Sequence, residues 1–138
     1  MENKETLLDM LIRHEGLKLK PYHDSVGKLT IGIGRNLDDV GITKEEAIYM
    51  CNNNIKEVTA QLNAALPWFK DQPDVVKNVL IDMGFMGVGS LLKFTFTLNY
   101  IKIKKYKAAA VEMLDSTWAR QVGDRAIELS NILKSVNQ

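Results

Sequence analysis

Two carboxylates near the N-terminus have the residue type and setting for acid–base chemistry. Glu15 ends an apolar helical pattern and lies four positions after Leu11, so it shares the apolar side of that helix. Asp24 begins a turn-like segment with Ser25 and Gly27. Cleavage of a glycosidic bond needs a protonated carboxyl for the leaving oxygen and a second carboxylate on the other face of the sugar. Because apolar surroundings favour a protonated carboxyl, Glu15 fits the first role, and Asp24 in a wetter turn fits the second.

The same residues also have ordinary structural interpretations. Charged residues are common at helix ends and aspartate is common in turns, so the pair alone is a weak signal. We expect His14 to be a surface or capping residue and His23 to be structurally neutral. Cys51 is the only cysteine, which excludes an internal disulfide, and we expect it to be a small buried side chain. Two histidines and one cysteine give no metal-ligand cluster of familiar spacing.

Hydrophobic periodicity predicts the elements that position these carboxylates. We expect a helix over residues 5–14 and a small twisted β-hairpin within residues 17–34, with a third short strand around residues 31–33. Thr43 and Glu46 have the spacing of a capping box, which predicts the start of a long helix that runs to the break at Pro67.

The rest of the chain is helical in pattern. A very apolar helix is expected over residues 74–85, and others over 96–104, 106–114 and 124–135. The inward-facing residues of the helix over 74–85 are predicted to be Val75, Val76, Val79, Leu80 and Met83. The fold class is therefore α+β and predominantly α-helical. We expect one domain with a β-containing lobe over residues 15–42, an inter-lobe helix over 43–65, and a helical lobe over 67–138 that includes the N-terminal helix. A cleft is expected between the lobes.

The amino-acid composition argues against several classes of function. The chain has 138 residues, 46% of them apolar, and a formal net charge of +1. This charge is too small to argue for nucleic acid or a membrane surface as a partner. No apolar run reaches the length of a membrane span, and the charged N-terminus does not look like a signal peptide. We therefore expect a protein made in the cytoplasm, without membrane insertion.

The order and intervals of Glu15, Asp24 and Thr30 resemble the N-terminal signature of the phage-type lysozymes, or endolysins (glycoside hydrolase family 24). The matching segments are HEGL at 14–17, YHD at 22–24, Gly27, and TIGIG at 30–34. Looser matches cover nearly all the remaining chain: GITKEEA at 41–47, LIDM at 80–83 with Phe85, AAV at 109–111, Ser116, Trp118, Gln121, Arg125 and Ala126. The resemblance implies a lysozyme-like two-lobe fold.

The resemblance also implies a role for each matching residue. Glu15 is the general acid that protonates the glycosidic oxygen. Asp24 assists the attacking water or stabilises the oxocarbenium-like centre, and Thr30 orients that water through its hydroxyl. Arg125 matches the arginine that pairs with the acidic glutamate. Without the resemblance, Thr30 is an ordinary strand residue and Arg125 an ordinary surface charge.

Four further residues match positions that line the family's substrate cleft. Phe85 and Thr97 keep the expected character, whereas Asn36 and Glu112 depart from the best-studied pattern. Simple core packing is an equally good interpretation of Phe85. Trp118 is expected to anchor the core of the helical lobe.

The activity implied is that of a bacteriolytic muramidase. It hydrolyses the β-1,4 bond between N-acetylmuramic acid and N-acetylglucosamine in peptidoglycan, with no cofactor or metal. The biological setting implied is host lysis by a phage or prophage, by a monomer that reaches the cell wall through a separate pore-forming protein. Two alternatives are a non-catalytic peptidoglycan-binding or phage tail module, and a lytic transglycosylase that uses a single glutamate.

Overall fold

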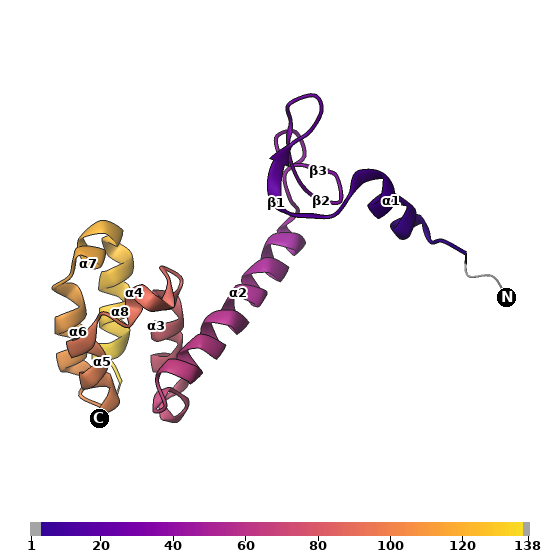
Figure 1. Ribbon diagram of the computed structural model, residues 1–138. Helices are drawn as coiled ribbons and strands as arrows, with labels where there is room; N and C mark the ends of the chain where they lie inside the picture. The colour runs from indigo at the N-terminus through magenta and orange to yellow at the C-terminus, as the bar shows by residue number, and fades with distance from the viewer. Residues whose placement is uncertain (1–3, 137–138) are drawn as a thin grey trace. The chain divides into compact units, whose positions relative to one another are not determined.

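The computed structural model describes residues 4–136, which form a mainly helical chain with one small sheet (Figure 1). This confirms the predicted α+β class. The chain divides into two compact units, here called the sheet unit (up to Met50) and the helical unit (from Cys51). The elements in order are α1 (Leu7–Glu15), β1 (Lys18–His23), β2 (Leu29–Gly32), β3 (Arg35–Asn36), α2 (Lys44–Ala65), η1 (Phe69–Asp71), α3 (Asp74–Gly84), α4 (Val88–Leu91), α5 (Thr95–Lys102), α6 (Tyr106–Leu114), α7 (Thr117–Val122) and α8 (Asp124–Lys134).

Helix α1 begins and ends where local chemistry dictates. The Thr6 hydroxyl accepts a hydrogen bond from the Asp9 backbone N–H at 3.0 Å, and the Asp9 carboxylate accepts one from the Thr6 N–H. This reciprocal capping box fixes the first turn. The helix ends at Glu15 because Gly16 adopts a φ of 81°. None of its residues is buried, and Leu7 and Leu8 are exposed.

The sheet has three antiparallel strands in the order β1-β2-β3. Thr30 is at its centre, paired with Tyr22 on β1 and with Asn36 on β3. The predicted hairpin is confirmed. The third strand occupies residues 35–36 rather than 31–33, because Ile31 belongs to β2 and the chain then turns through two glycines with positive φ.

The predicted start of α2 is confirmed. The Glu46 N–H donates to the Thr43 hydroxyl at 3.1 Å, and the Thr43 N–H donates to the Glu46 carboxylate at 2.9 Å. The expected burial of Cys51 is wrong, since its side chain is exposed. Of the α2 residues only Leu62, near the C-terminal end, is buried, and Val58 is partly buried against the same core.

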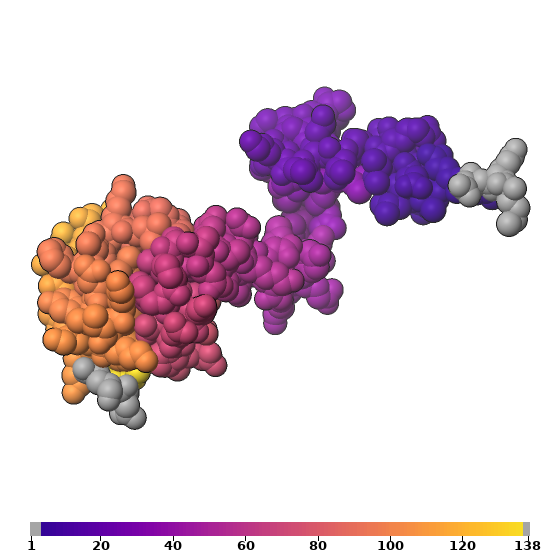
Figure 2. All heavy atoms as spheres, turned by 60° about the horizontal axis from the view of Figure 1, so that its bottom comes forward, coloured from indigo at the N-terminus to yellow at the C-terminus, as the bar shows by residue number. Residues whose placement is uncertain are grey.

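The core of the helical unit takes buried side chains from the end of α2, from η1 and from every helix between α3 and α8, and this unit is one closely packed body in Figure 2. Of the predicted inward face of α3, Val76, Val79, Leu80 and Met83 are buried, but Val75 is 49% exposed. Val75 precedes Val76 by about 100° of helix rotation, which turns it away from the other four. Trp118 is buried as predicted and meets Phe94 edge to face at 6.0 Å.

A buried polar pair ties separate segments of this core together. The Tyr106 hydroxyl donates to the Gln72 side-chain oxygen at 2.7 Å, and the Gln72 amide donates to the Ile101 carbonyl at 3.2 Å. Burial raises the pKa of Tyr106.

Among residues 4–136, no helix combines the length and apolar character that crossing a bilayer requires.

Candidate functional site

Glu15 lies directly against the turn between β2 and β3. A Cβ atom at Gly34 would lie 2.7 Å from one Glu15 carboxylate oxygen and 3.1 Å from its carboxyl carbon. Contacts this short essentially never occur, so a side chain at Gly34 would displace the end of the Glu15 side chain. Gly34 also has a φ of 73°, which glycine adopts without strain. Glu15 therefore lies where the end of α1 meets the turn between β2 and β3.

Asp24 is fixed by the hairpin turn that follows β1. One of its carboxylate oxygens, Oδ1, accepts hydrogen bonds from the backbone N–H groups of Val26 at 2.9 Å and Lys28 at 2.8 Å. Aspartate favours such turns because its short side chain can accept from the backbone that follows it. The Nδ1 atom of His23 lies 3.4 Å from the Gly27 carbonyl in the same turn, which agrees with a structural role.

Thr30 is enclosed at the centre of the sheet, with 3% of its surface exposed. Its hydroxyl donates to the Lys28 carbonyl at 2.8 Å. Because the hydroxyl proton is used in this bond, the oxygen presents its lone pairs to any further partner. The Lys28 carbonyl also accepts from the Asp24 N–H at 2.9 Å. The backbone of Lys28 therefore joins Asp24 to Thr30, a connection that sequence reasoning missed because no side-chain type signals it.

The burial of the two carboxylates differs from the expectation. Asp24 is half-buried and Glu15 is exposed, whereas the sequence predicted the more apolar setting for Glu15. The reason is that α1 buries none of its residues, so the apolar side that Glu15 shares with Leu11 does not enclose it. The carboxyl lies beside Gly34 without being enclosed.

Asn36 is part of the loop that follows β3. Its side-chain amide donates to the Asp39 carboxylate at 3.0 Å, and its side-chain oxygen accepts from the Asp39 N–H at 2.9 Å. Both ends of the amide are therefore engaged within the loop. The predicted contact of Asn36 with substrate stays a prediction.

An ion pair links β3 to the start of α2. Arg35 donates to the Glu46 carboxylate at 2.6 Å and to the Gly41 carbonyl at 3.2 Å. The Arg35 guanidinium, followed by the Thr43 N–H, lowers the pKa of Glu46 to about 2. This pair borders an apolar hollow of about 500 Å³ whose walls include Ile33 and Tyr49. No pattern in the sequence predicted a role for Arg35.

Two other predicted residues lie together in the helical unit. Phe85 and Arg125 line a hollow of about 360 Å³ with Asp82. Phe85 is 43% exposed, which argues against simple core packing. Arg125 donates to the Asp82 carboxylate at 2.7 Å and to its carbonyl at 3.0 Å. The predicted partner of Arg125 was Glu15. The pairing with Glu15 stays a prediction, and Asp82 is a partner that no pattern in the sequence indicated.

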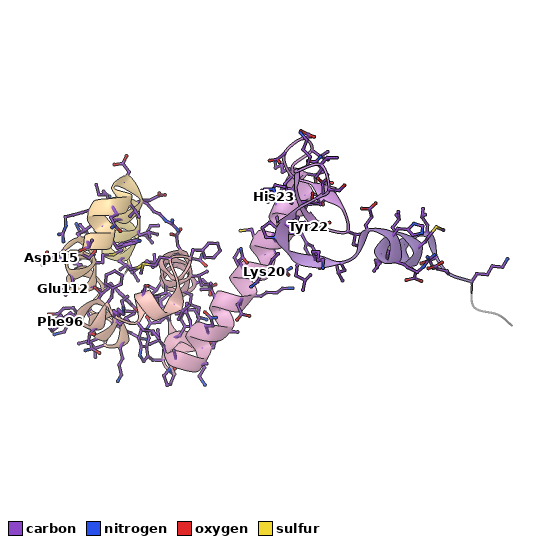
Figure 3. All side chains as sticks on the ribbon, turned by 45° about the horizontal axis from the view of Figure 1, so that its top comes forward. Lys20, Tyr22, His23, Phe96, Glu112 and Asp115 are labelled. Atoms are coloured by element: carbon purple, nitrogen blue, oxygen red, sulfur yellow. The ribbon has the colours of Figure 1, made fainter. Side chains whose placement is uncertain are left out.

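Thr97 and Glu112 line a second, smaller hollow of the helical unit, together with Phe96 and Asp115. Figure 3 shows Phe96, Glu112 and Asp115 along one side of this unit. Thus the structure groups the predicted residues in two sets: Glu15, Asp24, Thr30 and Asn36 in the sheet unit, and Phe85, Thr97, Glu112 and Arg125 in the helical unit. Within residues 4–136, no three His, Cys, Asp or Glu side chains gather as a metal site.

Comparison with known proteins gives a consistent family signal. Residues 12–135 match the model of the phage lysozyme family. "Probable T4-type lysozyme 1" of Dictyostelium discoideum is 27% identical, with 94% of each chain covered. "Endolysin" of Acyrthosiphon pisum secondary endosymbiont phage 1 is 30% identical, with 91% of this chain and 86% of the relative covered. "Pre-baseplate central spike protein Gp5" of Enterobacteria phage T4 is 26% identical over 96% of this chain but only 28% of its own length.

Proposed function

The chain belongs to the phage lysozyme family and is a lysozyme-type hydrolase, and from this premise we propose that it cleaves the β-1,4 bond between N-acetylmuramic acid and N-acetylglucosamine in peptidoglycan. The observation that carries the proposal is the contact between Glu15 and Gly34, which presents one carboxyl on the same small unit as Asp24 and Thr30. Glycoside hydrolysis requires two carboxyls with different tasks.

Glu15 is the general acid in this proposal. A general acid must deliver its proton to the oxygen of the leaving sugar from a fixed position. The Glu15 carboxyl group lies against the glycine turn, and its backbone ends a helix whose first turn is capped. Pairing with Arg125 is a further part of the proposal, in which the cation stabilises the carboxylate left after proton transfer.

Asp24 and Thr30 act on the water. The Asp24 Oδ1 atom is held by the turn, so the second oxygen has a fixed direction from which to accept a proton or stabilise a cationic sugar. The Thr30 oxygen can accept a hydrogen bond from the same water because its own proton is held by Lys28. Attack from the face opposite the leaving group requires the carboxyls to be about 6.5–9.5 Å apart and inverts the anomeric centre.

The test is release of reducing ends from purified peptidoglycan. Glu15→Gln removes the transferable proton and keeps the shape, so we expect activity to fall by about 10²–10⁴-fold with unchanged helical circular dichroism. Asp24→Asn should also cut turnover sharply. Glu45→Gln, an exposed carboxylate on the first turn of α2, is the matched control and should retain activity. Parental rates in Glu15→Gln would refute the assignment of the acid.

The same assay distinguishes the proposed hydrolysis from two alternative functions. The match to a spike protein over 28% of that protein's length is compatible with a module of a phage particle, for which a non-catalytic role predicts binding without products. A lytic transglycosylase would give anhydro ends in place of reducing ends, with Asp24 and Thr30 dispensable. For a lytic role we propose a separate pore-forming protein, so expression should lyse cells only when a pore-former is also present.

A further inference from the structure

The connection between α5 and α6 carries a local excess of positive charge. Residues 83–111 contain five lysines and no aspartate or glutamate. Four of these lysines lie within six residues and are here called the lysine cluster: Lys102, Lys104, Lys105 and Lys107. All four are exposed, and the two helices that carry them are joined by a short turn in Figure 1. The whole chain has a formal net charge of only +1, so the excess belongs to this surface and not to the composition.

No carboxylate among residues 4–136 forms an ion pair with the lysine cluster. The ion pairs of these residues use other cations: Arg13, Lys28, Arg35 and Arg125. The segment η1 packs beside the turn, because Gln72, directly after η1, hydrogen-bonds to the Ile101 carbonyl and the Tyr106 hydroxyl. This segment contributes Lys70 and Asp71, whose formal charges cancel. The positive charge of the cluster therefore faces solvent without compensation from η1.

Lys104 has a backbone conformation that favours glycine. Its φ is 63°, and every other residue with a positive φ within residues 4–136 is a glycine. The turn requires this conformation, since the Lys105 N–H donates to the Tyr100 carbonyl at 2.8 Å and closes the end of α5. A cation near the carboxyl end of a helix is favourable, but Lys102 already supplies one. A lysine at a position where the other turns have glycine indicates, independently of the charge count, that its charge is used.

An apolar side chain lies in the middle of the lysine cluster. Ile103 is 58% exposed and stands between Lys102 and Lys104, whereas Ile101 is fully buried in the core. An exposed isoleucine adds little to the recognition of a water-soluble polyanion, because such a partner offers it no apolar surface. It can instead enter the boundary between the headgroups and the acyl chains of a lipid layer, where basic side chains contact anionic headgroups.

We propose that the lysine cluster binds the surface of an anionic lipid membrane, with the ammonium groups against lipid phosphates and Ile103 within the headgroup boundary. Each lysine near an anionic lipid surface strengthens binding, and the attraction decays within a Debye length. The binding is peripheral, since one side chain enters the layer and no helix crosses it. The inference does not depend on the proposed hydrolysis, because no residue of the cluster belongs to that site.

The test is co-sedimentation of the full chain with vesicles of phosphatidylcholine alone, or of phosphatidylcholine mixed with an equal part of phosphatidylglycerol. We expect binding only to the mixed vesicles, and weaker binding as salt rises. Lys102→Gln with Lys105→Gln should lower the affinity by about fivefold for each lysine. Lys44→Gln with Lys56→Gln is the matched control, which removes the same charge from exposed positions of α2 and should keep the parental affinity.

Two single variants separate membrane binding from simpler roles. Lys104→Gly removes a charge and relieves the backbone, so we expect a higher urea midpoint together with about fivefold weaker binding to the mixed vesicles. A purely structural role of Lys104 predicts lower stability and unchanged binding. Ile103→Ser should weaken vesicle binding by about five- to tenfold and leave binding to soluble polyphosphate unchanged.

Equal binding to both kinds of vesicle, or no binding to either, would overturn the inference. An equal loss in the α2 control would do the same, because it would assign the effect to net charge. Parental vesicle binding in Ile103→Ser, with binding to vesicles and polyphosphate lost alike in the lysine double variant, would identify a soluble polyanion in place of the membrane. Reducing-end release from lipid-free peptidoglycan should be unchanged in every variant, so failure of the vesicle experiments leaves the hydrolase proposal standing.

Discussion

Replacement of Gly34 by alanine tests the positioning of Glu15 directly. The added methyl group would lie 2.7 Å from a Glu15 carboxylate oxygen and 3.2 Å from its Cγ atom. The side chain must therefore move, because ordinary contacts begin at 3.4 Å. The matched control is Gly32→Ala. Gly32 has a φ of 70° against 73° at Gly34, but no atom lies within 4 Å of its added methyl group.

The size of each effect follows from this comparison. A non-glycine residue in the left-handed region costs about 1–2 kcal/mol, and both variants incur this cost. Only Gly34→Ala also displaces the end of the Glu15 side chain, which is exposed and flexible, so the added cost in stability is small. The carboxyl must shift by about 0.7 Å to restore a normal contact, and misplacement on this scale lowers turnover by about ten- to a hundredfold. We expect Gly32→Ala to keep near-parental turnover.

The assays are urea unfolding for stability and reducing-end release for turnover. In a Glu15→Ala background, which removes the clashing atoms, the two glycine variants should have equal free energies of unfolding. Full turnover in Gly34→Ala would refute the reasoning. Equal loss of turnover in both variants would also refute it, since it would show that backbone strain, and not the contact with Glu15, governs activity.

Two other contacts give predictions of stability. Tyr106→Phe leaves the buried Gln72 oxygen without its donor and should lower the free energy of unfolding by about 1–3 kcal/mol. Burial raises the pKa of Tyr106, so the neutral phenol stabilises the fold below the ordinary tyrosine pKa, and this contribution is lost as pH rises through the raised value. Above pH 10, the free energy of unfolding should accordingly fall less steeply with pH in the variant than in the parent. Glu46→Gln keeps the capping hydrogen bonds but loses the charge that pairs with Arg35. Because the pKa of Glu46 is lowered to about 2, the thermal advantage of the parent should be full above pH 4.5 and vanish as pH falls towards 2. A gap that stays constant down to pH 2 would contradict this.

Local signals in the sequence predicted the elements that local chemistry determines. The box formed by Thr43 and Glu46 starts α2 as expected, and the predicted helix over residues 106–114 has the observed bounds. Helices α4 and α7 were not predicted. The first is a single turn that follows Gly87 and contains Gly89, and the second spans six residues. Helices this short depend on packing rather than on their own propensity.

The candidate site was predictable only as a set of residue types. Asp24 was expected in a turn and Thr30 on a strand, and both are there. The pairing of Arg125 with Asp82, separated by 43 residues, depends on how α3 and α8 pack, which no local pattern encodes. The exposure of Val75 and Cys51 has the same origin, because burial depends on the surface that the rest of the chain supplies.

The role of Lys28 has a consequence for how this protein tolerates change. Its peptide groups hold Asp24 and Thr30, while its side chain extends outward to an exposed contact with Asp39. Nearly any amino acid could therefore stand at this position without disturbing its two neighbours. A one-residue insertion or deletion in the same loop would instead uncouple them. In natural variants of this chain, the amino acid at position 28 should accordingly vary freely, whereas the number of residues between positions 24 and 30 should stay constant.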